Sequence, residues 1–142
     1  MISACIGAID GVQIAIKKPS NSEVPNPTAY YNRKGHFALN VQAVADSTRR
    51  ITWASIRTPG AVHDANAYAL SALFITFIAL GICPFHLVGD DAYSNSESML
   101  CPIPGTLPPG SREDAFNYYQ SLTRQPVERG GLCFARSLRA RL

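Results

Sequence analysis

Four acidic side chains are the residues whose types and surroundings could carry out chemistry. Asp10, Asp64 and Asp90 each follow an apolar stretch or a turn and have small neighbours, and Glu128 lies nearer the C-terminus. If they converge at one edge of a sheet, their oxygens could hold two cations about 3.5 to 4 Å apart, as phosphodiester chemistry requires. Carboxylate ligands of this kind suit Mg²⁺ or Mn²⁺.

Each of these acids also has an ordinary structural explanation. Aspartate before glycine, as at Asp10, is a common turn residue. Asp64 could cap the helix that it begins, and Glu128 could be a first-turn glutamate, because the helix dipole favours a negative charge there. The spacing alone leaves both explanations open.

The segments around the acids predict strands that would deliver them. Residues 4–9 form an apolar run that ends at Asp10, and residues 85–88 form a shorter run that leads to Asp90. Residues 12–16 alternate apolar and other side chains, so they are either a second strand or the continuation of the first. Two aspartates are therefore expected where strands end.

A hairpin and two loops are expected as well. Residues 36–45 and 51–58 have strand-like alternation and are separated by a turn at Asp46, which predicts a hairpin. Proline, glycine and small polar residues dominate residues 19–27 and 102–110, where neither helix nor sheet could persist.

Two helices are predicted, and one of them raises a membrane alternative. Residues 64–81 have helical length and a glycine stop, yet residues 65–85 carry no charge. Their densest apolar part is about fifteen residues, short of the roughly twenty that a spanning helix needs. A buried helix covering one sheet face explains the same residues. A second helix starts at Arg112, is interrupted at Pro126 and restarts at Val127.

Charge and cysteine usage narrow the class of protein. Residues 1–111 hold seven Lys/Arg and seven Asp/Glu, whereas residues 112–142 hold six Arg and three acids, so the C-terminal end is cationic. Basic pairs near predicted loops could contact a phosphate backbone. No secretory signal or zinc-ligand spacing is present, which favours an intracellular protein with reduced thiols. The cysteines are Cys5, Cys83, Cys101 and Cys133.

Five blocks of residues, in order and in register, resemble one known family. They are Ala8-Ile9-Asp10-Gly11 followed by Ile14 to Lys17; Tyr30 to Gly35 leading to Asn40-Val41-Gln42-Ala43; Pro59 to Asp64; Leu87 to Asp90 with Tyr93; and Thr123-Arg124 with Val127-Glu128-Arg129. The chain resembles the DDE superfamily endonuclease domain of Harbinger-type transposases and their derived nucleases. The resemblance covers about residues 5–129.

The resemblance implies a single catalytic domain over residues 1–142. Its fold would be an RNase H-like mixed sheet flanked by helices, truncated at both ends. Residues 130–142 depart from the family and form a divergent tail, and Gly130 and Gly131 would weaken the helix there, because each glycine costs about 1 kcal/mol relative to alanine.

The resemblance also assigns roles to individual residues. The catalytic acids would be Asp10, Asp90 and Glu128, and the metal ligands would be these three with Asp64, which matches a further family acid. The adjacent Asp91 is out of register. Expected contacts with DNA are Tyr31, Arg33, Lys34, Arg124 and Arg129.

The implied function is a DNA endonuclease or transposase catalytic domain that uses Mg²⁺ or Mn²⁺ to cleave or join phosphodiester bonds. The alternative is an inactive, truncated or domesticated remnant that binds DNA or protein. No DNA-binding helices fit before Asp10, so a separate DNA-binding protein is an expected partner. The family implies a nuclear location.

Overall fold

A five-stranded sheet forms the centre of the protein in a computed structural model that describes residues 4–79 and 84–139. The strand order is β3-β2-β1-β4-β5. β1 is antiparallel to β2, β2 is antiparallel to β3, and β4 and β5 run parallel to β1. The strands are β1 (Cys5–Ala15), β2 (Ala38–Ala45), β3 (Ile51–Pro59), β4 (His86–Val88) and β5 (Met99–Leu100).

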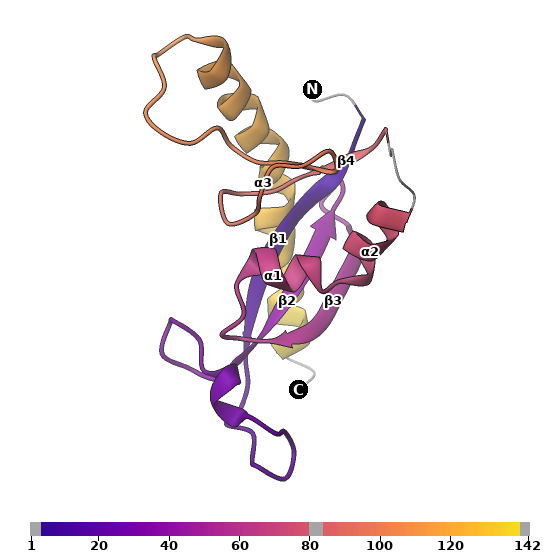
Figure 1. Ribbon diagram of the computed structural model, residues 1–142, viewed down its shortest axis with the longest axis vertical. Coiled ribbons are helices and arrows are strands. Elements are labelled where there is room, and N and C mark those ends of the chain that lie inside the picture. Colours follow the sequence, from indigo (N-terminus) through magenta and orange to yellow (C-terminus); the bar gives the residue numbers. More distant parts are fainter. Residues whose placement is uncertain (1–3, 80–83, 140–142) are drawn as a thin grey trace.

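Helices cover both faces of this sheet (Figure 1). The short helices α1 (Asp64–Ala69) and α2 (Ala72–Ala79) lie on one face, and the long helix α3 (Arg112–Arg139) crosses the other. A 3-10 turn, η1 (Pro27–Tyr30), precedes β2. This mixed α/β arrangement agrees with the predicted fold class.

Side chains alternate between the two faces along β1. Ile9 packs with Val44 and Tyr68 on the face of α1 and α2, whereas Ala8 packs with Ala45 and Val127 of α3. Even-numbered residues of β1 therefore face α3, and odd-numbered residues face α1. This alternation decides on which side of the sheet each functional residue lies.

The strand predictions are confirmed, with residues 12–16 largely continuing the first strand, but the single helix predicted over residues 64–81 is wrong. α1 ends at Ala69 and α2 begins at Ala72. Ser71 lies between them, almost fully buried, and its Oγ accepts a hydrogen bond of 3.2 Å from the Phe74 N–H. A serine side chain that caps the second helix in this way competes with continuation of the first.

The predicted interruption at Pro126 is also wrong, because α3 continues through this residue. Proline removes one helical hydrogen bond, but the neighbouring Val127 is completely buried against β1 and β2. Gly130 is buried too, and a Cβ there would lie 3.2 Å from the Arg49 carbonyl oxygen. Packing against the sheet, rather than helix propensity, keeps this part of α3 helical.

Two further expectations concern the surface and the thiols. No helix in residues 4–79 and 84–139 is long and apolar enough to cross a membrane. Cys5 and Cys101 are free thiols, as predicted, and Cys83 lies outside the described residues.

Candidate carboxylate active site

Asp10 lies within β1, and Asp90 comes two residues after the end of the neighbouring parallel strand β4. β1 and β4 are paired through Ala8 and Val88, and each aspartate follows its partner residue by two positions. Adjacent strands are about 4.8 Å apart. The two carboxylates therefore start from neighbouring points of the sheet. Asp90 follows a strand end as predicted, but the prediction for Asp10 is wrong, because β1 continues past it to Ala15.

The electrostatic environment of Asp10 is unfavourable for its charged form. Burial and, to a smaller extent, the negative charge of Asp90 raise the pKa of this carboxyl to about 6. The Gly11 N–H, which donates a 2.9 Å hydrogen bond to Asp10 Oδ1, and the Arg124 guanidinium lower the pKa only in part. Asp10 thus lacks enough nearby positive charge to ionise easily.

Asp90 is held by a local turn and by α3. The Ala92 N–H donates to Asp90 Oδ1 at 2.9 Å, and burial raises the pKa of this carboxyl as well. The fully buried side chain of Gln120 on α3 donates its amide N–H to the Gly89 carbonyl, immediately before Asp90. Asp91 points into solvent. These contacts connect the end of β4 directly to the helix that carries Glu128.

Glu128 reaches the site through Arg124, one helical turn earlier. Arg124 Nη2 lies 3.2 Å from Glu128 Oε1 and 4.0 Å from Asp90 Oδ2. The Arg124 side chain is only 15% exposed, whereas that of Glu128 is 50% exposed. The Arg124 Nε is buried and has no hydrogen-bond partner within the described residues. The Arg124 guanidinium therefore lies between the carboxylates of Asp90 and Glu128.

Asp64 lies on the other side of β1, next to Gly11. A Cβ at Gly11 would fall 2.0 Å from Asp64 Oδ1, so only glycine leaves room for this carboxylate. Oδ1 accepts hydrogen bonds of 2.9 Å from the side-chain amides of Asn40 and Gln42. The N-cap of α1 is His63, which makes no side-chain capping bond. Asp64 is thus held by β2, and both of its recorded hydrogen bonds come from side chains.

The chemistry of these donors fits a hard divalent cation. Asp10 and Asp90 are neighbouring carboxylates whose pKa values are raised mainly by burial, and carboxylate oxygens are the ligands that such cations prefer. Within residues 4–79 and 84–139, no three acidic, histidine or cysteine side chains are close enough together to hold an ion as they stand. Arg124 would have to move before Asp90 and Glu128 could share one.

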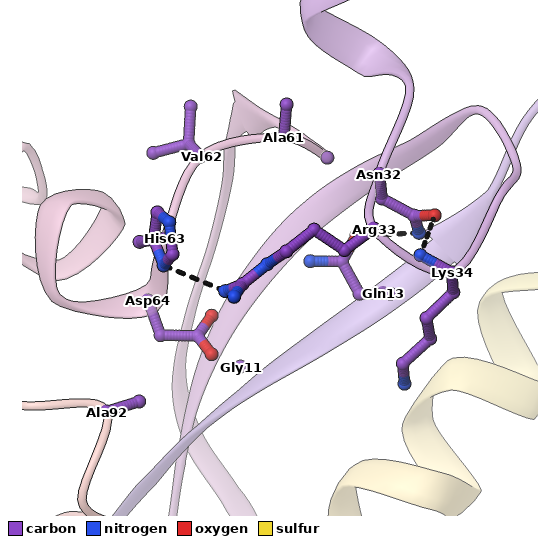
Figure 2. Close-up of a pocket in the computed structure, with 11 residues that line it drawn as sticks. Gly11, Gln13, Asn32, Arg33, Lys34, Ala61, Val62, His63, Asp64 and Ala92 are labelled. Atoms are coloured by element: carbon purple, nitrogen blue, oxygen red, sulfur yellow. Dashed lines mark hydrogen bonds between the residues drawn. The ribbon is translucent and has the colours of Figure 1, made fainter.

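A polar cavity of about 250 Å³ lies on the Asp64 side of β1. Figure 2 shows the Arg33 side chain reaching across it to His63, beside the Asp64 carboxylate. Arg33 Nη2 and His63 Nδ1 are 2.8 Å apart. Asn32 Oδ1 accepts the Lys34 backbone N–H at 3.0 Å and so fixes the loop. Two predicted DNA contacts, Arg33 and Lys34, therefore border a cavity next to a predicted metal ligand.

The other predicted DNA contacts lie apart from this cavity. Tyr31 is half exposed and packs edge to face against Phe37, with ring centroids 5.1 Å apart. Arg129 is exposed on α3. Arg124, by contrast, is turned inward to the acids, so in this arrangement its guanidinium neutralises carboxylates.

Comparison with known proteins identifies the family. The sequence profile of the family described as DDE superfamily endonuclease matches residues 9–136. The chain belongs to this family. The match includes all four acids and continues past residue 129, where the motif resemblance ends. The order of strands and the flanking helices are those of an RNase H-like fold.

One curated relative of this DDE superfamily member is a protein of Rattus norvegicus named "Putative nuclease HARBI1". It is 27% identical over 124 residues, which make up 87% of the chain and 34% of the relative. The chain thus spans about a third of the length of this relative. No solved structure matches the chain significantly.

Three residues of the DDE superfamily site were not predicted as functional from the sequence. Asn40 and Gln42 are fully buried, and Tyr93 is 5% exposed, although its OH donates to Gln42 Oε1 at 2.6 Å. The available signal was the pair of amides at alternate positions of a strand. That pattern also describes a solvent-facing strand edge, which is why it was not conclusive.

Proposed function

We propose that this chain is the catalytic domain of a Harbinger-type, divalent-metal-dependent DNA endonuclease or transposase. Asp10, Asp90 and Glu128 are its catalytic acids, and Asp64 is a further metal ligand. The observation that carries the proposal is the placement of Asp10 on β1 and Asp90 just after the neighbouring strand β4, with a pKa of about 6 at Asp10. A bound cation would stabilise the charged form of Asp10, which burial and then the charge of Asp90 disfavour.

The chain's own residues would prepare this site in two ways. Gln120 joins the end of β4 to α3, which keeps Asp90 near Glu128. Partial burial of Asp10 strengthens its interaction with a cation. When bound, Mg²⁺ or Mn²⁺ would activate the attacking oxygen and stabilise the leaving oxygen of a phosphodiester.

DNA would pass over both sides of the β1 end. Arg33 and Lys34 border the cavity beside Asp64, Tyr31 is exposed, and Arg129 is exposed next to Glu128 in the sequence. Basic side chains of this kind neutralise phosphates without reading sequence. Arg124 would join them after a cation displaces it from the acids. We expect the chain to act in the nucleus, with a separate DNA-binding protein as partner.

A second candidate function keeps the fold without the chemistry. Arg124 already forms the ionic contacts with Asp90 and Glu128 that a cation would otherwise form. A chain in which this arrangement is permanent would be a domesticated DNA- or protein-binding remnant. The two candidates differ in whether a divalent cation can replace the guanidinium.

Nicking of supercoiled plasmid in Mn²⁺ or Mg²⁺ separates them. We expect metal-dependent nicking that falls below detection in Asp10→Asn, Asp90→Asn and Glu128→Gln. Asp91→Asn is the matched control, because it changes an exposed carboxylate next to Asp90 and should leave nicking intact. Nicking that survives Asp10→Asn would come from a contaminant, and absence of nicking by the unaltered chain would favour the remnant.

A further inference from the structure

A buried chain of hydrogen bonds runs behind the acidic site from Tyr93 to Asp64. The Tyr93 OH donates to Gln42 Oε1 at 2.6 Å. The Gln42 Nε2 group then donates to Asn40 Oδ1 and to Asp64 Oδ1, each at 2.9 Å. Asn40 Nδ2 donates to the same Asp64 oxygen and to the Val62 carbonyl.

Which group donates and which accepts along this series of hydrogen bonds follows from the chemistry of the side chains. An ionised aspartate can only accept, so Gln42 must turn its NH₂ group toward Asp64. Its carbonyl oxygen then faces Tyr93, whose hydroxyl must donate. Burial raises the pKa of this hydroxyl above its usual value, which keeps the proton in place. Removing the Tyr93 OH would therefore remove one of the two contacts that fix which way Gln42 points.

The same chain connects the structural elements that carry the acids. Gln42 is paired with Gly11 of β1, the residue that follows Asp10. Asp64 begins α1, and Tyr93 follows Asp90 by three residues. A fully buried glutamine at this position is unfavourable for folding unless all its polar atoms are paired, and here they are.

We propose that Gln42 is a positioning residue, which holds Asp64 against Gly11 of β1 and couples its orientation to the Asp90 loop through Tyr93. This rests on the proposed function, in which Asp64 is a metal ligand. Asp64 Oδ1 is taken by the two amides, so Oδ2 is the oxygen that Gln42 leaves for a cation. Residues behind metal ligands typically change affinity or activity about 10- to 100-fold when they are replaced.

The test compares Gln42→Met with the unaltered chain. Methionine keeps the length of the side chain and removes both amide functions. We expect the Kd for Mn²⁺, measured by calorimetry without DNA, to rise about tenfold or more. The Mn²⁺ concentration for half-maximal nicking should rise in parallel, while KM for DNA at saturating Mn²⁺ stays unchanged.

A structural control comes from Thr58→Val. This buried hydroxyl donates to the Asn40 backbone carbonyl at 3.0 Å and does not contact Asp64. It should lower thermal stability about as much as Gln42→Met but leave the Kd for Mn²⁺ unchanged. If both variants shift the Kd equally, the role of Gln42 is only structural and the proposal is overturned.

Tyr93→Phe tests whether the hydrogen bonds from Tyr93 to Asp64 act as a unit. It can also be measured alone if Gln42→Met does not fold. It should weaken Mn²⁺ binding severalfold alone and add nothing to Gln42→Met, because linked residues act non-additively. Full additivity, or unaltered Mn²⁺ binding in a folded Gln42→Met variant, overturns the positioning role. An unaltered chain that binds Mn²⁺ without nicking refutes only the proposed function; one that binds no Mn²⁺ refutes both.

Discussion

Replacement of Asp10 by asparagine should stabilise the metal-free protein at neutral pH. The pKa of Asp10 is raised from 3.8 to about 6 in the folded chain, mainly by burial and then by Asp90. A difference of about two pKa units corresponds to about 3 kcal/mol between the two protonation states. Asparagine keeps the shape, and its Oδ1 can still accept from the Gly11 N–H.

The sign follows from proton binding. Between about pH 4 and pH 6 the folded chain holds a proton on Asp10 that the unfolded chain has lost, so the free energy of unfolding falls as pH rises. Above pH 6 the decrease in the free energy of unfolding is complete and amounts to at most about 3 kcal/mol. Below pH 4 both states are protonated, and the difference disappears.

Urea denaturation at several pH values measures this effect. The free energy of unfolding of Asp10→Asn should exceed that of the unaltered chain by about 1 to 3 kcal/mol at pH 7.5 and equal it at pH 4. Asp91→Asn, which changes an exposed acid, should remain within about 0.5 kcal/mol throughout. The reasoning is refuted if Asp10→Asn is no more stable at pH 7.5, or if its advantage persists at pH 4.

Three further outcomes are expected. Gly11→Ala should destabilise the fold by about 1 to 3 kcal/mol in urea denaturation, because its Cβ would overlap Asp64 Oδ1; a neutral result would contradict the tight approach. Arg33→Ala combined with Lys34→Ala should weaken binding of random-sequence DNA and reduce the salt dependence of its Kd, with a slope change of about two. Arg124→Gln should tighten Mn²⁺ binding in calorimetry, because the cation no longer competes with the guanidinium for Asp90; weaker binding would show that Arg124 supports the metal site.

The parts of the fold that depend on local pattern could be predicted from the sequence. The placement of Asp90 after β4 follows from an apolar run that stops at a Gly-Asp step. The Asp10-Gly11 step does not end β1, because pairing with β2 continues to Ala15. The break at Ser71 and the continuity of α3 at Pro126 depend on side-chain capping and on burial of Val127, which are properties of packing. Local pattern could not reveal either.

For the candidate site, the sequence predicts individual residues but not how they are arranged. The acids are recognisable individually, but their arrangement on opposite sides of β1 depends on the pairing of Gly11 with Gln42. Gln42 is polar in a strand that is buried on both faces, where an alternating pattern would usually indicate solvent. Arg124 matches a basic DNA contact in sequence, and only its side-chain position reveals the inward ion pairs.

The anchor between Gln120 and Gly89 also sets how sensitive the site is to small movements of α3. Glu128 lies eight residues beyond Gln120 along the same helix, a separation of about 12 Å at 1.5 Å per residue. With Gln120 fixed, a tilt of only about 10° would shift Glu128 by about 2 Å relative to Asp90. DNA or a partner protein that presses on the exposed surface of α3 could thereby adjust the gap between two carboxylates without touching either of them.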